Sequence, residues 1–190
     1  MKEAKTAIFV ILLVTGLVST TFPIYVQTSK AESNDNWTLI HNGRGLKAYP
    51  DLREYVWQKN AAMAPHGPYD MIGLRRLVKT GITPKGVVLL CPGTNGNAEQ
   101  LMSNPPGDSW TKYENLSQPL YWANRDYDVF GIDYRTHFVP IDLSLSQLSF
   151  MANWGYDQWT SDLKEIVEKA KEVSGAKRIY LAGISFGGNM

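Results

Sequence analysis

The stretch "YLAGISFGGNM", residues 180–190, combines an apolar strand, a sharp turn and the start of a helix. Ser185 lies at the apex of the turn, between Gly183 and Gly187. A turn of this kind is so tight that the positions beside the serine tolerate almost no side chain, and it exposes the serine hydroxyl. The helix that follows directs its free N–H groups toward the same point. The stretch therefore predicts a nucleophilic serine at the end of a buried strand.

Short apolar runs predict the strands that would support this turn. They are "GVVLLC" (86–91), "YDVFGIDY" (127–134) and "KRIYLAGIS" (177–185). The clearest helix between them, over 157–174, carries its apolar residues on one stripe and ends at Gly175. The alternation of such strands with amphipathic helices predicts an α/β fold with a mostly parallel sheet and helices on both faces.

The carboxyl ends of parallel strands are where ligands bind in sheets of this type. Three turns are expected to meet at that edge: 92–96, 135–139 and 183–188. The segment 135–155 shows no clear period and is predicted to be a long loop. Two further strands are predicted nearer the N-terminus, over 55–58 and 72–78.

Composition narrows the classes of function. The chain has 190 residues, of which 44% are apolar, and a formal net charge of +1. The apolar content predicts a packed domain, and the balanced charge speaks against nucleic acid as a partner. A single cysteine, Cys91, excludes a disulfide framework and a multi-cysteine metal site. The stretch "GTNGNAE" (93–99) lacks the Gly-Lys-Ser/Thr ending of a phosphate-binding loop, so neither a metal nor a cofactor is predicted.

Residues 1–31 have the anatomy of a secretory signal. A basic start precedes the uncharged apolar run "TAIFVILLVTGLV" (6–18), and small residues up to Ala31 suit cleavage after that residue. The alternative is an uncleaved anchor, because the uncharged stretch from Ala7 to Val26, about twenty residues, is long enough to span a bilayer. Either reading places residues 32–190 outside the cytoplasm as one domain, secreted or tethered through an N-terminal membrane contact.

Residues from about 70 to 190 resemble the first half of an α/β-hydrolase domain of the serine esterase and lipase type. The stretch 86–101 resembles the third strand and oxyanion loop of that fold, and 127–137 resembles the strand that commonly ends in D-Y/F-R-G-H. The stretch 155–188 resembles the helix, strand and nucleophile elbow that follow. The resemblance implies an α/β-hydrolase fold that is truncated after the strand carrying the nucleophile.

Carried over by position, the resemblance implies that Ser185 is the nucleophile of a hydrolase that forms an acyl-enzyme. The substrate would be a small-molecule ester or a related acyl compound, and no cofactor is implied. The backbone N–H groups of Phe186 and Thr94 would form the oxyanion hole. Asn95 is the alternative to Thr94, because Pro92-Gly93 stands where many members of the family have His-Gly.

The triad acid and histidine that the resemblance implies would follow the serine, and the 190 residues contain neither at such a position. The histidines, His41, His66 and His137, all precede Ser185. Only His137 lies at the correct edge of the predicted sheet, where the family's histidine usually shapes the loop. The chain as given is therefore expected to be inactive, with the strand at 179–184 left as an unprotected sheet edge.

Two alternatives stay open. The glycines at 187 and 188 also occur in peptidase branches of the fold, so amide substrates are not excluded. The second hypothesis belongs to another class of function: the chain would be a truncated, non-catalytic remnant or a binding module that retains the fold.

Overall fold

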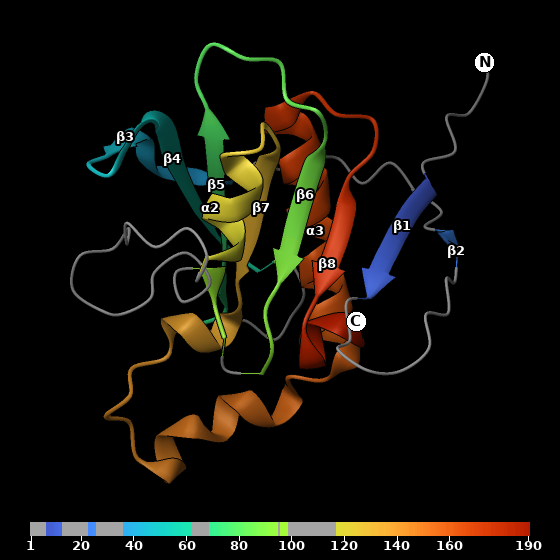
Figure 1. The fold of residues 1–190 in the computed structure, drawn as a ribbon. Helices are drawn as coiled ribbons and strands as arrows, with labels where there is room; N and C mark the ends of the chain where they lie inside the picture. The colour runs from blue at the N-terminus through green and yellow to red at the C-terminus, as the bar shows by residue number, and fades with distance from the viewer. Residues whose placement is uncertain (1–6, 13–22, 26–35, 62–68, 95, 99–116) are drawn as a thin grey trace.

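The structure is a computed structural model that describes residues 7–12, 23–25, 36–61, 69–94, 96–98 and 117–190. Its centre is an eight-stranded sheet in the order β2-β1-β8-β6-β7-β5-β4-β3 (Figure 1). The strands are β1 (Ala7–Leu12), β2 (Pro23–Tyr25), β3 (Thr38–Leu46), β4 (Tyr49–Asn60), β5 (Met71–Lys79), β6 (Val87–Cys91), β7 (Asp128–Asp133) and β8 (Tyr180–Gly183). The described helices are α2 (Gln118–Ala123) and α3 (Tyr156–Ser174), with 3-10 segments η2 (Arg135–Phe138), η3 (Leu145–Asn153) and η4 (Ser185–Gly188).

The sheet is mixed, which corrects the expectation of a mostly parallel sheet. Strand β6 pairs in parallel with β7 and β8, and β1 pairs in parallel with β8. Strands β3, β4 and β5 form an antiparallel run that joins β7, also antiparallel. A parallel pair needs a crossover of about a dozen residues or more. The connection from β3 to β4 contains only residues 47 and 48, so these two strands form a hairpin.

The strands predicted from the apolar runs are confirmed, with shifted ends. Strands β6, β7 and β8 lie within the three predicted runs, and the predicted strands 55–58 and 72–78 lie inside β4 and β5. All residues of β6 and β7 are buried, as expected of strands that are covered on both faces.

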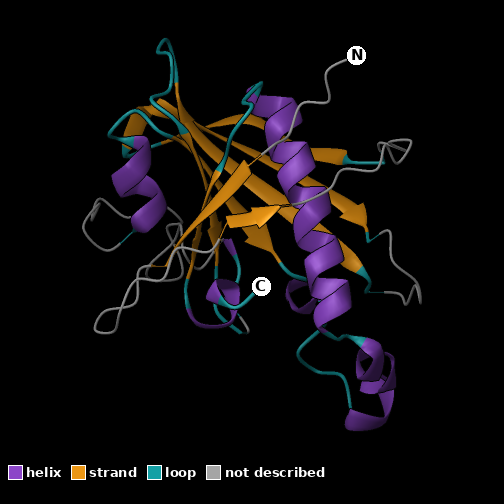
Figure 2. Cartoon of the chain, turned by 90° about the vertical axis from the view of Figure 1, so that its right-hand side faces the viewer, coloured by secondary structure: helices purple, strands orange, loops and turns teal. Residues whose placement is uncertain are grey.

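Apolar side chains of alternate strand residues form two core clusters, one on each face of the sheet. Leu89 belongs to the cluster that includes Ile166 of α3, whereas Leu90 belongs to the cluster that includes Leu120 of α2. Because successive strand residues point to opposite faces, α2 and α3 cover opposite faces of the sheet. Figure 2 shows the two helices on either side of the strands.

Helix α3 confirms the predicted helix within one residue at its start. Ile166, Val167 and Ala170 are buried on the stripe that the sequence predicted. The helix ends where Gly175 takes a left-handed conformation with φ of 69°, and the Gly175 N–H donates to the Lys171 carbonyl. Helix α3 is therefore followed by β8 and then by the turn at Ser185.

The segment 135–155 is not the irregular loop that was expected, because it contains the 3-10 segments η2 and η3. No residue of η3 is buried, and Ile141 and Leu145 are exposed. Figure 1 shows η3 beyond the carboxyl ends of β6 and β8. Sequence periodicity missed η3 because none of its residues is buried, so it has no apolar face, and η2 has only four residues.

Strand β8 is not a sheet edge in the structure, contrary to expectation. β1 pairs with it on the side away from β6, in a register that aligns Phe9 with Tyr180 and Leu12 with Gly183.

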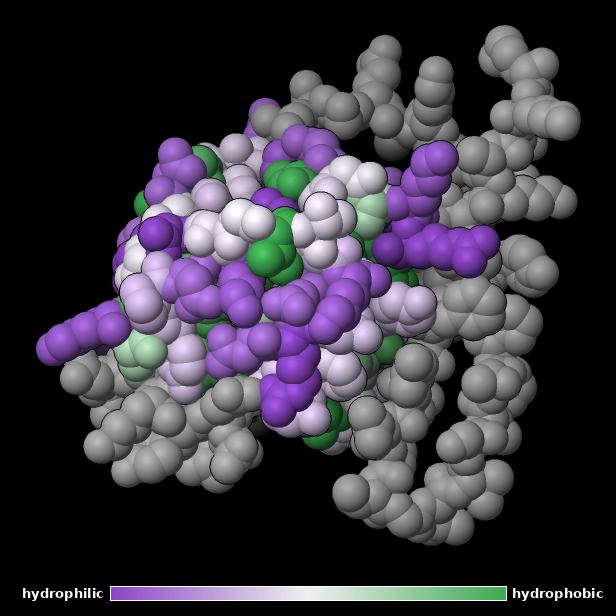
Figure 3. All heavy atoms as spheres, turned by 45° about the horizontal axis from the view of Figure 1, so that its top comes forward, coloured by the Kyte–Doolittle hydropathy of each residue, from purple (hydrophilic) through white to green (hydrophobic). Residues whose placement is uncertain are grey.

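None of the helices in the described residues has the length and apolar composition needed to cross a bilayer. Figure 3 shows that the face toward the amino ends of the parallel strands is mostly hydrophilic, with apolar residues as isolated spots.

Candidate active site

The candidate site lies where the chain changes direction across the sheet. Strand β6 lies between β7 and β8, and the chain runs from β6 to β7 on one side and then returns through α3 to β8 on the other. In open sheets the carboxyl ends of strands at such a switch point are the usual ligand-binding position. The segments after β6, β7 and β8 meet there.

Ser185 has a strained backbone. Its φ is +53°, a left-handed value that non-glycine residues rarely adopt. Two hydrogen bonds hold the turn around it: the Ile184 N–H donates to the Cys91 carbonyl at 3.1 Å, and the Gly187 N–H donates to the Ile184 carbonyl at 3.0 Å. Asn189 Nδ2 donates to the Ser185 carbonyl at 3.2 Å. Ser185 itself is exposed. The surrounding structure therefore maintains a strained residue with a solvent-accessible side chain.

The glycines beside Ser185 are required by space. A Cβ atom on Gly183 would lie 2.2 Å from the Gly187 carbonyl oxygen. A Cβ atom on Gly187 would lie 2.2 Å from the Cys91 carbonyl oxygen. Neither glycine has a positive φ, so close backbone packing, and not backbone freedom, explains both residues.

The loop after β6, of which residues 92–94 and 96–98 are described, approaches the serine closely. A Cβ atom on Gly93 would lie 3.3 Å from the Ser185 Cβ and 3.7 Å from its Oγ. The Gly96 N–H donates to the Gly93 carbonyl at 2.9 Å and closes a tight turn. Thr94 is exposed at this turn, and Asn95, the alternative oxyanion donor, lies outside the described residues.

Residues at the end of β7 hold this loop at several points. The Tyr134 hydroxyl donates to the Pro92 carbonyl at 3.0 Å. Asp133 Oδ1 accepts from the Ala98 N–H at 2.9 Å, and Asn97 Nδ2 lies 2.7 Å from His137 Nδ1. Neither His137 nor His41 is hydrogen-bonded to Ser185 in the part of the chain that the structure describes, and His66 lies outside that part.

Cys91 is adjacent to the site, at the end of β6, but is not suited to nucleophilic chemistry. Burial raises the pKa of its thiol from 9.0 to about 12. Since the thiolate is the reactive form of cysteine, a thiol that stays protonated at neutral pH is inert. The interpretation of Cys91 as a small buried residue of a strand therefore agrees with its surroundings.

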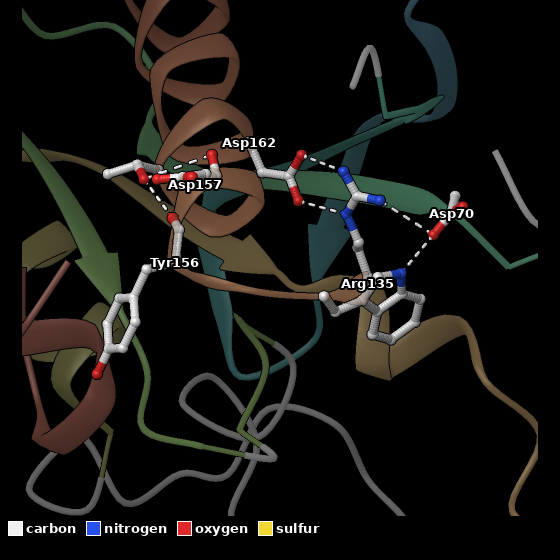
Figure 4. A network of polar contacts seen from close by, with 7 residues as sticks. Asp70, Arg135, Tyr156, Asp157 and Asp162 are labelled. Atoms are coloured by element: carbon white, nitrogen blue, oxygen red, sulfur yellow. Dashed lines mark hydrogen bonds and ion pairs between the residues drawn. The ribbon is translucent and has the colours of Figure 1, made fainter. Parts of the chain in front are cut away.

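A buried ionic network ties the segment after β7 to helix α3 (Figure 4). Arg135 is fully buried, and its Nε and Nη2 donate to the two carboxylate oxygens of Asp162 at 2.6 and 2.8 Å. Its Nη1 donates to Asp70 Oδ1 at 3.0 Å, and Trp154 Nε1 donates to the same oxygen at 2.7 Å. Burial acts to lower the pKa of Arg135, but the bonds and charges of Asp162 and Asp70 raise it above its ordinary value.

Sequence reasoning missed this network. The available signal was an arginine directly after a buried strand, together with Asp162 next to the apolar stripe of α3. Charged side chains are almost never fully buried unless they are paired, so the two residues could have been matched.

Among the described residues, no group of three or more histidine, cysteine or acidic side chains is placed to bind a metal ion.

Aromatic rings surround the residue that follows the serine. Phe186 packs edge-on against Tyr134 and Trp159, with ring centroids 6.1 and 5.6 Å apart, and contacts Tyr156 at 5.8 Å. These rings come from the residue after β7 and from α3, so both parts of the chain fix the position of Phe186.

Comparison with known proteins shows which solved structures the chain is similar to. No protein-family model and no curated protein matches the chain. The crystal structure of a candidate lipase from Sulfolobus solfataricus is 39% identical with a TM-score of 0.71, and the match covers 80% of this chain and 43% of that one. A candidate acetyl xylan esterase from Bacteroides fragilis is 19% identical with a TM-score of 0.49, over 78% of this chain and 42% of that one.

The chain thus spans less than half the length of either protein. Only the first likeness bears on the fold, and it supports a hydrolase fold of the esterase and lipase type.

Proposed function

We propose that the described domain is part of an α/β-hydrolase and that Ser185 is the nucleophile of a serine esterase. The observation that carries the proposal is the strained, exposed Ser185, with φ of +53°, at the carboxyl end of a parallel strand. Backbone strain in a non-glycine residue persists only where the surrounding structure imposes it, and such residues cluster at active sites.

The reaction would be acyl transfer in two steps. Ser185 Oγ attacks the ester carbonyl carbon and gives its proton to a general base, and the resulting tetrahedral intermediate expels the alcohol, which takes up that proton. Water then attacks the acyl carbon and gives a proton to the same base, and the bond to Ser185 Oγ breaks as the oxygen takes that proton, which releases the carboxylic acid and restores the serine. The general base is proposed to come from outside the described residues, because neither described histidine is hydrogen-bonded to Ser185.

The negative oxygen of the tetrahedral intermediate would be bound by the backbone N–H groups of Thr94 and Phe186. Support for this assignment comes from the short approach of Gly93 to Ser185 and from the start of η4 at the serine. Loss of one oxyanion donor typically lowers kcat by about 10²–10³-fold, so the exact placement of this loop controls the rate.

The proposed substrate is a small-molecule carboxylic ester. The Sulfolobus protein is described as a candidate lipase, which favours an ester over an amide.

Export is proposed on the sequence of residues 1–31 alone, as a cleaved signal or a membrane anchor. Fusion of residues 1–40 to a reporter that is active only outside the cytoplasm tests the proposal, and a silent, stable fusion would contradict it.

A non-catalytic binding module is the second candidate. The observation that favours it is that neither described histidine is hydrogen-bonded to Ser185. The two functions differ in turnover, because a binding module would not hydrolyse an ester whether or not Ser185 is present.

The test is hydrolysis of an activated short-chain ester by the intact gene product that contains these residues. Ser185→Ala should lower kcat by about 10⁴-fold or more, since loss of a nucleophile removes the covalent route. Ser149→Ala, at an exposed serine of η3, is the matched control and should leave kcat unchanged. Equal turnover by the wild type and Ser185→Ala would refute the assignment.

A further inference from the structure

We infer that Tyr134 is a positioning residue that fixes both walls of the oxyanion hole. The first wall is the loop that carries Thr94, and the second wall is the turn that carries Phe186. This inference rests on the proposed function of Ser185. Tyr134 follows the last residue of β7 and is only 4% exposed. Its hydroxyl contacts the loop that carries Thr94, and its ring contacts Phe186.

The hydroxyl acts on the first wall. It donates to the Pro92 carbonyl at 3.0 Å, two residues before Thr94. Because a peptide unit is planar, fixing this carbonyl also fixes the plane of the N–H of Gly93. The proline ring restricts φ at residue 92, and the bond from Gly96 to Gly93 closes the far side of the turn. Few backbone rotations are then left to reorient the Thr94 N–H.

The ring acts on the second wall. It packs edge-on against Phe186, whose backbone N–H is the other proposed donor, with an interplanar angle of 78°. Trp159 of α3 contacts both rings, at 5.5 Å from Tyr134 and 5.6 Å from Phe186. Edge-to-face pairs of this kind prefer defined geometry, so the three rings define where η4 begins.

The hydroxyl keeps its proton at any working pH. Burial raises the pKa of Tyr134. Tyr134 therefore acts as a permanent donor to the Pro92 carbonyl and takes no part in proton transfer. Asp133, the residue before it, holds the Ala98 N–H but has no ring that could pack against Phe186.

The experiment compares Tyr134→Phe with wild type in the intact gene product. The substitution keeps the ring and removes one hydrogen bond, so the thermal transition should remain cooperative. We expect kcat to fall about 10–100-fold with KM changed less than about twofold, because a displaced donor weakens binding of the transition state only. A purely structural role would leave the kcat of the folded variant unchanged.

The matched control is Tyr127→Phe, at the other end of β7. Its ring packs against Trp122, on the opposite side of the sheet from α3. This control should keep the wild-type kcat and KM. Phe186→Leu is the second variant; it keeps the backbone N–H and removes the ring contact, and it should also lower kcat. Tyr134→Phe keeps this ring contact and removes only the hydroxyl bond to Pro92, so the two variants test the two walls separately.

The outcomes separate this inference from the proposed function. Wild-type kcat in folded Tyr134→Phe, or a rise in KM alone, overturns the role of Tyr134 and leaves Ser185 untouched. Turnover that does not depend on Ser185 overturns both. Loss of kcat in Tyr134→Phe with KM preserved, together with a normal Tyr127→Phe, supports the inference.

Discussion

At the scale of single residues, the turn at 183–187 requires both free space and a strained backbone, and glycine and serine residues meet these two requirements separately. The glycines supply space, because a Cβ atom on either would lie 2.2 Å from a carbonyl oxygen. Ser185 carries the strain, with φ of +53°. The sequence pattern predicted that the positions beside the serine have no room for a side chain. It did not predict the left-handed φ of Ser185, because amino-acid composition does not reveal a backbone dihedral angle.

The substitution Gly187→Ala tests the requirement for space. Its Cβ would clash with the backbone at Cys91 and Pro92, so either β6 or the turn must move. We expect a loss of about 3 kcal/mol or more in the free energy of unfolding, measured by denaturant titration. Gly45→Ala is the control: its nearest neighbour would be an Arg53 nitrogen at 3.7 Å, an ordinary contact, so the expected change is below about 0.5 kcal/mol. Equal effects of the two substitutions would contradict the close packing of the elbow.

At the scale of elements, local pattern was enough wherever the element is defined by its own residues. Strands β6 and β7 were predicted because every residue in them is buried, which makes β6 apolar throughout and β7 free of exposed polar residues between its two terminal aspartates. Helix α3 was predicted because its apolar stripe has a period close to 3.6 residues.

Local pattern failed where partners are distant in sequence. The antiparallel pairing of β5 with β7 joins Gly73 to Asp133, and the contact of Arg135 with Asp70 spans 65 residues. No short window of sequence contains both partners of such a contact. In the candidate site, Ser185 and its glycines were therefore predictable, whereas the contacts of Tyr134 and Arg135 were not.

The network of Arg135 gives a prediction at this scale. Asp162→Ala would leave a buried guanidinium with only Asp70 as a charged partner among the contacts described above. Removing one partner of a buried pair typically costs about 3–5 kcal/mol, and we expect a loss in that range by denaturant titration. Glu168→Ala, on the same helix, removes an exposed pair with Lys171 and should cost less than about 1 kcal/mol. A loss for Asp162→Ala no larger than that of the control would show that the network does not hold α3 in place.

At the scale of the whole molecule, the pairing on the outer side of β8 leads to a prediction about association with other chains. In the structure β1 pairs with β8 and occupies that edge. The sequence of residues 1–31 also predicts export, and cleavage after Ala31 would remove β1. An uncovered strand presents a row of unpaired N–H and C=O groups to other chains.

The chain 32–190 should therefore associate in solution. We expect size-exclusion chromatography to show oligomers or aggregates, because β8 has no partner on that side once β1 is removed. Tyr180→Lys in the same chain places a charge on an exposed position of β8 and should shift the profile toward monomer. A monodisperse chain 32–190 with a sharp cooperative melting transition would contradict this view of the edge.

Covalent labelling tests whether Ser185 is the nucleophile. The intact gene product is treated with a fluorophosphonate, whose phosphorus would bond to Ser185 Oγ with release of fluoride, and the adduct is located by mass spectrometry. We expect a single adduct on the peptide that contains "GISFGG" (183–188), and no adduct on Ser185→Ala. An adduct on another residue, or none on a folded protein that hydrolyses esters, would contradict it.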